Sequence, residues 1–308
     1  MQLKKVKVLI LGATGMLGHT LLHDFSRREG LAVHASARSR EGLSRWFPPE
    51  IAERIHTPVD ADDFASVARV LEEVRPEVVI NCIGVIKQLA AAKDPLACIM
   101  INALFPHRLA KACAGIGARL IHISTDCVFS GKKGGYVESD FPDCDDLYGR
   151  TKLLGEVDYP HAVTLRTSII GHELNSSVSL IDWFLAQQGR VKGFTKAIYS
   201  GFPTVEMARI IAEIVIPRPE LCGLYHVSSA PISKYDLLVL VRKEYGKTIE
   251  IEADDGFVCE RSLDSSRFRA STGYVPPPWE EMVKRMHEGG MSGEKGLKNF
   301  QEVSSVQK

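Results

Sequence analysis

A tyrosine and a lysine four residues apart form the first pair that could do chemistry. The segment YGRTK occupies residues 148–152, with Tyr148 and Lys152 at its ends. Positions i and i+4 lie on one face of a helix, so the phenol and the ammonium can reach the same ligand. A tyrosine with an ordinary pKa of about 10 shuttles protons poorly at neutral pH, and a nearby lysine ammonium would lower that pKa. The pair predicts a proton donor, although the same spacing is also common on exposed helices.

A cluster of hydroxyl and carboxyl groups precedes this pair at the end of an apolar run. The segment STDCVFSG covers residues 124–131, and Thr125 is its candidate for contacting a substrate carbonyl. Ligands of open α/β sheets bind where parallel strands end, which favours a role in binding or catalysis. A cluster of Ser, Thr and Asp that caps a turn is the alternative.

Three glycines near the start of the chain indicate a nucleotide site. The segment GATGMLG follows an apolar strand-like run and opens a helical pattern. Glycines permit a tight turn and a close approach of the backbone to a pyrophosphate, and the helix N-terminus attracts that anion. We favour a dinucleotide loop over a merely tight turn. The residues expected to line it are Gly12, Thr14, Gly15, Met16, Leu17 and Gly18.

The choice of cofactor is read about 20 residues further on, at the end of the second strand. No acidic residue that would bind a ribose 2′-hydroxyl occurs between His34 and Arg40, and Glu41 is the first. Arg38 is available for a 2′-phosphate. We therefore expect NADP(H) rather than NAD(H), unless these arginines are simply solvated.

The elements that must position these residues alternate between strands and helices. Strands are expected at 6–11, 32–37, 54–59, 78–82, 119–124 and 163–168. Helices are expected at 16–28, 64–74, 95–114 and 148–157. Strict alternation of apolar strands and helices predicts an α/β fold with a Rossmann-type, doubly wound parallel sheet.

The pattern changes after residue 170. Helices are expected at 180–187, 205–215, 234–245 and 279–286, with strands at 224–227 and 249–251. We expect residues 1–170 to form the dinucleotide-binding domain and residues 171–288 a smaller C-terminal α/β substrate lobe. Residues 289–308 are rich in Gly, Ser and Lys and are expected to form a flexible tail.

Composition argues against a nucleic-acid-binding, membrane-bound or disulfide-rich protein. The chain has 308 residues, and its 38 basic residues balance 38 acidic ones, so nothing attracts nucleic acid or an anionic membrane at long range. Seven cysteines without a close pair indicate reduced thiols in a cytoplasmic protein. Lysines before an apolar run at residues 8–22 resemble a signal peptide, but glycines interrupt the run, and we expect no targeting or membrane segment. His19 and His23 lack a third ligand, so no metal site is expected.

The spacing of the three glycines resembles the extended short-chain dehydrogenase/reductase family. The segments at 124–131, 135–138 and 147–156 resemble, more narrowly, the dTDP-4-dehydrorhamnose reductase family. Later pieces at 201–204, 223–228 and 261–265 fit as well, so the resemblance covers residues 6–287.

This resemblance implies hydride transfer between NAD(P)H and the C4 keto group of a nucleotide-linked deoxysugar, as in polysaccharide biosynthesis, in an enzyme that can form a homodimer. Tyr148 would protonate the carbonyl oxygen, Thr125 would polarise it, and Lys152 would bind the nicotinamide ribose. Further residues implied at the cofactor are Asp60 by the adenine, Cys82, Ile83 and Gly84 along the cleft, and Asn102 beside the active site.

Two segments depart from the family pattern where substrate contacts are implied. Residues 86–90 read IKQLA in place of an acidic stretch, and Ile198-Tyr199 replaces Asp-Gln. We therefore expect a substrate other than dTDP-4-dehydrorhamnose. The residues expected to bind substrate are Lys87, Trp183, Lys196, Tyr199 and Arg261.

Two other functions stay open. The same scaffold serves nucleotide-sugar epimerases and dehydratases, which typically carry an acid after the second strand. A non-catalytic NADP-binding regulatory subunit, like the β subunit of methionine adenosyltransferase, is the second alternative.

Overall fold

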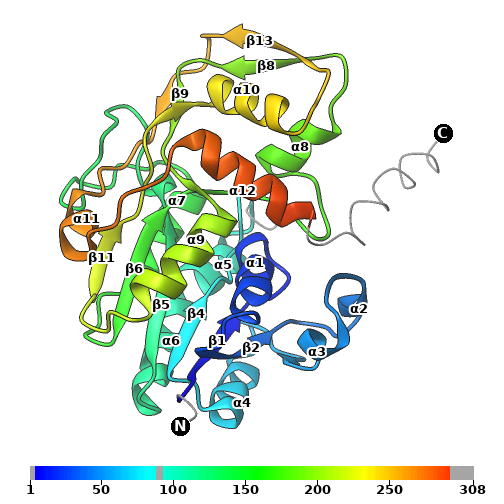
Figure 1. Cartoon of the computed structure of the whole chain (residues 1–308). Helices are drawn as coiled ribbons and strands as arrows, with labels where there is room; N and C mark the ends of the chain where they lie inside the picture. The colour runs from blue at the N-terminus through cyan, green and yellow to red at the C-terminus, as the bar shows by residue number, and fades with distance from the viewer. Residues whose placement is uncertain (1–3, 88–92, 292–308) are drawn as a thin grey trace.

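A seven-stranded parallel β-sheet lies at the centre of the computed structural model, which describes residues 4–87 and 93–291 (Figure 1). The strands run in the order β11-β6-β5-β4-β1-β2-β3, so the chain starts in the middle and winds outward in both directions. Their bounds are β1 Val6–Leu11, β2 Leu31–Ser36, β3 Ile55–His56, β4 Val78–Asn81, β5 Arg119–Thr125, β6 Ala162–Thr167 and β11 Gly223–His226.

Strand β1 shows why these runs are almost wholly apolar. Val8 and Ile10 pack into the core on one face of the sheet, and Leu9 and Leu11 pack into the core on the other. Helices α1 (Met16–Phe25), α9 (Thr204–Ile210) and α12 (Trp279–Met291) pack on the first face. Helices α4 (Phe64–Val74) and α6 (Phe105–Gly115) pack on the second. The doubly wound α/β fold expected from the sequence is confirmed.

The six strands expected in the first 170 residues are all present, and their ends differ by at most one residue. The exception is β3, which has two residues where six were expected. Pro58 follows this strand closely, and because proline has no N–H it cannot continue a hydrogen-bonded ladder.

Strand β11 corrects the expected organisation of the chain. The sequence analysis assigned residues 224–227 to the smaller lobe, but β11 pairs with β6 in parallel and forms the outer strand of the main sheet. The chain therefore returns to the main sheet after residue 170. Spacing along the sequence could not reveal this, because an apolar strand pairs equally well in either sheet.

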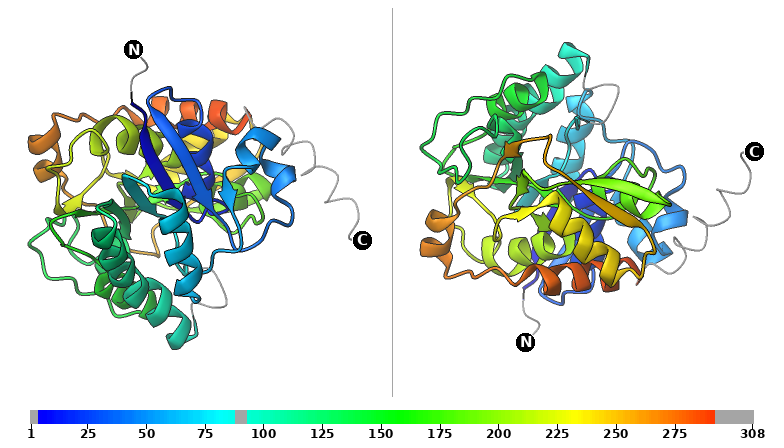
Figure 2. Two further views of the ribbon diagram at one scale, coloured as in Figure 1. Left: turned by 90° about the horizontal axis from the view of Figure 1, so that it is seen from below. Right: turned by 90° about the horizontal axis from the view of Figure 1, so that it is seen from above.

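The smaller lobe lies beyond the carboxyl ends of the main strands (Figure 1), and Figure 2 shows it from above in the right panel. Its strands β8 (Arg190–Phe194) and β13 (Glu250–Asp254) pair in parallel. Strand β9 (Ala197–Tyr199) lies between β12 (Ile232–Ser233) and β14 (Cys259–Glu260). Its helices are α8 (Leu180–Ala186) and α10 (Lys234–Glu244). The sequence analysis found both helices but missed β8, in which charged and apolar residues alternate at first, and β9, which has only three residues.

Short elements complete the fold. They are α2 Leu43–Trp46, α3 Pro49–Ala52, η3 Asp126–Val128, α7 Leu147–Leu154, β7 Ile169–Ile170, β10 Phe202–Pro203, η4 Ile211–Val215 and α11 Ser266–Thr272. Strands β7 and β10 pair with each other. No helix within the described residues is long and apolar enough to span a membrane.

The expected helix at 95–114 contains a π-helical segment. It divides into α5 (Pro95–Cys98), η2 (Ile99–Leu104) and α6, with Asn102 inside η2. Pro106 has no N–H to donate to the carbonyl of Asn102, which interrupts the α-helical pattern there. A Cβ on Gly155 would lie 1.9 Å from that carbonyl, so Gly155 lets the chain after α7 approach η2 closely.

The end of the last helix differs from the expectation. A flexible tail was expected from residue 289, but α12 runs through Met291, so Gly289 and Gly290 are helical. Residues 292–308 lie outside the described residues.

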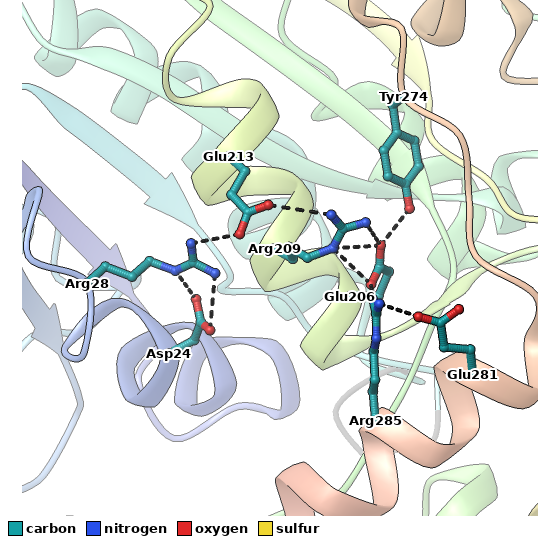
Figure 3. A network of polar contacts seen from close by, with 8 residues as sticks. All are labelled: Asp24, Arg28, Glu206, Arg209, Glu213, Tyr274, Glu281 and Arg285. Atoms are coloured by element: carbon teal, nitrogen blue, oxygen red, sulfur yellow. Dashed lines mark hydrogen bonds and ion pairs between the residues drawn. The ribbon is translucent and has the colours of Figure 1, made fainter.

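A buried carboxylate fastens α12 to α9 (Figure 3). The side chain of Glu206 is 1 % exposed and accepts hydrogen bonds from Arg209 at 2.6 Å, Tyr274 at 2.7 Å and Arg285 at 3.0 Å. Burial alone would raise the pKa of Glu206, but the hydrogen bonds from Arg209 and Tyr274 lower it overall. The network extends along the surface through Glu213 and the other residues that Figure 3 labels.

Replacing this carboxylate tests how much the network stabilises the fold. Glu206→Gln should reduce the free energy of unfolding by about 2 kcal/mol at pH 7, because two arginines lose a buried counter-charge. Since the folded pKa is lowered, the difference from wild type is complete above the ordinary Glu value and should shrink as the pH falls below it. Urea denaturation at several pH values measures both effects.

Glu281, which pairs with Arg285 and is 49 % exposed, provides the control. Glu281→Gln should cost less than ~0.5 kcal/mol, because solvent screens exposed pairs. Equal losses in the two variants would contradict a special role for the buried carboxylate.

Candidate active site and dinucleotide cleft

The glycine loop joins β1 to α1 in a turn that only glycine can make. Gly12 has a φ of +90°, a conformation that other residues rarely adopt. A Cβ on Gly18 would lie 2.0 Å from the carbonyl oxygen of Gly12, so the loop closes directly on the helix. The Ala13 N–H donates to the Ser36 carbonyl at 2.8 Å, which ties the loop to β2.

This loop fits a pyrophosphate. Gly15 is the N-cap residue of α1 and supplies no side-chain cap, so the first N–H groups of Met16 and Leu17 are not covered by one. The N-terminus of a helix attracts an anion through these groups and through the helix dipole. Thr14 lies half-buried in the same turn.

The neighbouring strands β2 and β3 end beside the expected adenosine position. Arg38 follows β2, is exposed, and makes no hydrogen bond or ion pair with any described residue. Its guanidinium is free for an anion. Asp60 follows β3, and the Ser66 hydroxyl accepts a hydrogen bond from its N–H at 2.9 Å. The carboxylate of Asp60 accepts from the N–H of Asp62 at 3.1 Å.

The segment after β4 forms the opposite wall of the cleft. A Cβ on Gly12 would lie 3.1 Å from the Ile83 side chain, so the two loops face each other closely. Cys82 and Gly84 flank Ile83 and are half-buried. The segment after β4 therefore packs directly against the glycine loop.

Asn102 holds this wall in place from within. Its side-chain oxygen accepts from the Val85 N–H at 2.9 Å, and its amide donates to the Val85 carbonyl at 3.0 Å. A weaker contact of 3.5 Å reaches the Thr151 hydroxyl on α7. Asn102 was expected to contact the cofactor, and in the structure its side chain joins the segment after β4 to α7.

Three residues expected to be catalytic come together where β5 ends. Thr125 is the last residue of β5; its hydroxyl donates to the Asp126 carboxylate at 3.3 Å and lies near enough to the Tyr148 phenol to lower the pKa of that phenol. Asp146 caps α7 by accepting from the Gly149 N–H at 2.7 Å, which fixes the start of the helix that carries Tyr148. Lys152 is buried one turn later, and its ammonium donates to the Ile123 carbonyl at 2.8 Å.

The electrostatics of this trio correct one expectation. Lys152 was expected to lower the pKa of Tyr148, but burial and the neighbouring Cys127 and Asp126 raise it, with only the Thr125 hydrogen bond opposing them. Burial also lowers the pKa of Lys152 to about 8, although the negative charge of Glu156 opposes this shift. The Tyr148 phenol therefore keeps its proton at neutral pH, which suits a donor of that proton.

A carboxyl group that the sequence analysis did not assign lies beside the trio. Asp126 is 6 % exposed, and burial raises its pKa although Arg261 and Lys234 oppose this. Its position in the Ser-Thr-Asp segment was a signal that could have identified it. Lys234 begins α10 and has no hydrogen bond or ion pair within the described residues, and nothing in its sequence context distinguishes it from a surface lysine.

Arg261, which was expected to bind substrate, contacts the segment that follows β5. Its guanidinium donates to the Phe129 carbonyl at 2.8 Å and contacts the Cys127 sulfur at 3.7 Å. Lys87 lies at the edge of the site, where its ammonium pairs with Asp146 at 2.7 Å. Arg261 therefore contacts the residues that directly follow β5, whereas Lys87 contacts the residue that caps α7.

The remaining expected substrate residues lie on the smaller lobe. Tyr199 is 8 % exposed, donates to the Ser168 carbonyl at 3.3 Å and packs against Trp279. Lys196 pairs with Asp255 at 3.3 Å at the surface. Trp183 lies on α8 and is 37 % exposed. No contact joins Lys196 or Trp183 to the catalytic trio within the described residues, and residues 88–90 of the divergent segment lie outside them.

Comparison with known proteins identifies the family to which the chain belongs. A sequence model described as the RmlD substrate binding domain matches residues 6–290. The chain belongs to this family. The family resemblance expected from the sequence is thereby confirmed.

Three proteins similar to this chain carry names of two different functions, an adenosyltransferase subunit and a reductase. The methionine adenosyltransferase 2 subunit beta of Xenopus tropicalis is 27 % identical over 90 % of this chain and 80 % of its own. The dTDP-4-dehydrorhamnose reductase of Mycobacterium tuberculosis is 31 % identical over 60 % of this chain and 58 % of its own. A crystal structure of dTDP-4-dehydrorhamnose reductase from Bacillus anthracis in complex with NADP matches with a TM-score of 0.74 and 23 % identity. It covers 92 % of this chain and 99 % of that one, which shows the shared fold.

A methyl group added at Gly18 tests whether this loop binds a dinucleotide. Gly18→Ala should weaken NADPH binding at least tenfold, because the new Cβ would strike the Gly12 carbonyl and push the turn away from the helix. Fluorescence titration with NADPH measures the dissociation constant.

Gly30 provides the matched control, because a Cβ at Gly30 would meet no atom within 4 Å. Gly30→Ala should bind NADPH like the wild type. Unchanged binding by a folded Gly18→Ala variant would show that the nucleotide binds elsewhere.

Proposed function

We propose that this chain is an NADP(H)-dependent reductase of the 4-keto group of a nucleotide-linked deoxysugar. The observation that carries the proposal is the meeting of Thr125, Tyr148 and Lys152 at the carboxyl end of β5. Two of these residues lie on α7 and the third on a strand, so the fold and not the sequence spacing alone creates the site. The glycine loop supports the same proposal, because it leaves a helix N-terminus open to a dinucleotide.

Each residue of the trio has a distinct task in this reaction. The bound cofactor supplies a hydride to the carbonyl carbon. Tyr148 donates its proton to the carbonyl oxygen, and its raised pKa keeps that proton in place until charge develops on the oxygen. Thr125 donates a hydrogen bond to the same oxygen. Lys152 presents an ammonium one helical turn after Tyr148, where it can hold the ribose hydroxyls.

Removal of the proton donor tests this assignment. Tyr148→Phe should reduce turnover by roughly two to four powers of ten, the usual size of a general-acid effect, and should leave NADPH affinity nearly unchanged. Stopped-flow measurement of NADPH oxidation gives the rate, and fluorescence titration gives the affinity. Near-normal turnover in this variant would refute the role of Tyr148.

The proposed preference for NADP(H) depends on Arg38. This arginine is exposed and unpaired among the described residues, and no acid lies nearby on the strand end. The Bacillus anthracis relative binds NADP, which supports the same preference.

Reversing the charge at this position should reverse the preference. The wild type should bind NADPH more tightly than NADH, and Arg38→Asp should equalise or invert the two dissociation constants, because a carboxylate repels the 2′-phosphate and accepts from a 2′-hydroxyl. Equal constants in the wild type would contradict the proposal.

We infer that the natural substrate differs from dTDP-4-dehydrorhamnose. Tyr199 takes the place of a polar residue of the family, and its hydroxyl is already bonded to the Ser168 carbonyl. The wall it offers is therefore largely apolar, and a sugar hydroxyl buried against it without a partner would cost about 1–3 kcal/mol. A deoxysugar with fewer polar groups on this side fits better.

A panel of substrates tests both the activity and this specificity. The protein is incubated with NADPH and with dTDP-, UDP- and GDP-linked 4-keto-6-deoxy sugars, and the loss of nicotinamide absorbance is followed. We expect turnover with at least one sugar and a lower kcat/KM for dTDP-4-dehydrorhamnose. No turnover with any sugar would contradict the reductase.

A second function is favoured by the likeness to methionine adenosyltransferase 2 subunit beta, which extends over 90 % of the chain. In that case the chain would bind NADP and act as a subunit of a cytoplasmic enzyme, without turnover of its own. An epimerase or dehydratase is less well supported, because no acid lies between the end of β2 and Arg40.

A further inference from the structure

A buried carboxylate lies one helical turn after Lys152 and takes no part in the mechanism above. Glu156 follows α7, and its side chain is 10 % exposed. One oxygen accepts from the Ser124 hydroxyl at 2.6 Å and from Arg166 Nε at 2.7 Å. The other accepts from Arg166 Nη2 at 2.6 Å, which makes the pair with Arg166 bidentate.

These contacts connect Glu156 to two catalytic residues at once. Ser124 directly precedes Thr125 on β5, so the bond from its hydroxyl fixes the end of that strand against α7. Lys152 donates to the carbonyl of Ile123, which directly precedes Ser124 on β5, and Glu156 lies four residues after Lys152, just beyond the end of α7. The sequence contained this signal, but the motif was read for its tyrosine and lysine alone.

The other groups around the Lys152 ammonium provide no negative charge. The Ile123 carbonyl accepts its hydrogen bond, and burial raises the pKa of the nearby Cys82 thiol to about 12, so this thiol is neutral at pH 7. His122 on β5 is fully buried and stays neutral, because burial and the Lys152 charge lower its pKa well below the ordinary value. Within the described residues, Glu156 is the one carboxylate that raises the pKa of Lys152.

Resting on the proposed function, we propose that Glu156 is a positioning residue that keeps the buried Lys152 ammonium charged and aligns the Ser124–Thr125 strand end beneath the substrate carbonyl. Burial of an ammonium favours its neutral form, and a carboxylate held at the neighbouring residue of β5 opposes this. Without Glu156, Lys152 loses its proton within the physiological range and with it the charge that holds a ribose.

Arg166 explains how Glu156 stays ionised in a dry environment. Its guanidinium is 3 % exposed, lies over the Phe129 ring at 5.3 Å and contacts the His226 ring at 3.3 Å. Arg166 thus supplies a counter-charge on the side of Glu156 toward β6 and β11. It is not among the groups that shift the pKa of Lys152, so the two partners of the pair have separable effects.

The pKa of Lys152, measured in the cofactor-free protein, tests the proposal. The 15Nζ chemical shift of Lys152, assigned by its absence in Lys152→Met, is followed against pH. We expect a pKa of about 8 in the wild type and a fall of ~1 unit in Glu156→Gln, the lower end of the effect of an opposite charge at short range. An unchanged Lys152 pKa in a folded Glu156→Gln protein would overturn the proposal.

Two further variants separate charge from structure. Glu156→Asp retains the charge but disturbs the bonds to Ser124 and Arg166, so the Lys152 pKa should stay near the wild-type value. If Glu156→Gln does not fold because Arg166 is left unpaired, Glu156→Gln with Arg166→Met removes both charges and should show the same fall. A wild-type Lys152 pKa in this double variant, or a fall of equal size in Glu156→Asp, would contradict the role of the charge.

The titration needs no substrate, so its outcome is separate from that of the sugar panel. A protein without reductase activity but with a Glu156-dependent Lys152 pKa would refute the proposed function alone. In an active enzyme, the alkaline limb of NADPH binding should move to lower pH in Glu156→Gln by the same amount as the Lys152 pKa.

Discussion

The buried ion pair between Glu156 and Arg166 ties the end of α7 to the sheet, and much of the candidate site depends on it. Glu156 extends from the end of α7 to Ser124 on β5, and Arg166 extends from β6 to His226 on β11. His226 in turn contacts the Tyr136 carbonyl, so the loop that carries Phe129 is held by the same chain of contacts. Removing two charges from water is costly, and such a pair is retained more for specifying one arrangement than for stability. Here that arrangement places α7 against the carboxyl end of β5.

This arrangement accounts for the character of the catalytic groups. Burial keeps the Tyr148 phenol protonated and brings the pKa of Lys152 to about 8, so both groups are held in a poorly solvated environment before any ligand arrives. Fixed donors in such an environment act strongly on a developing negative charge, because no solvent must reorganise around them. Asn102 adds to this order by joining the wall of the dinucleotide cleft to η2.

The sequence predicted those parts of the fold and site that depend on local pattern. The apolar run of β1, the three glycines and the pair Tyr148–Lys152 each have a spacing that physical chemistry interprets directly. The place of β11 could not be predicted, because strand pairing between distant segments leaves no local signal. The direction of the Tyr148 pKa was mistaken for a related reason: it depends on burial and on Asp126 and Cys127, which only the folded chain brings near. The ion pair of Lys196 with Asp255 likewise joins segments that are separate in sequence.

Transfer of a deuteride tests the central claim, that the retained trio reduces a sugar carbonyl. The protein is incubated with NADPH carrying deuterium at nicotinamide C4 and with the 4-keto sugar on which it is most active, and the product sugar is examined by mass spectrometry and NMR. A reductase with this geometry places one deuterium on C4 of the sugar from one face of the nicotinamide. A protein that binds the labelled cofactor tightly but leaves the sugar unlabelled would contradict the account and favour the role of a subunit.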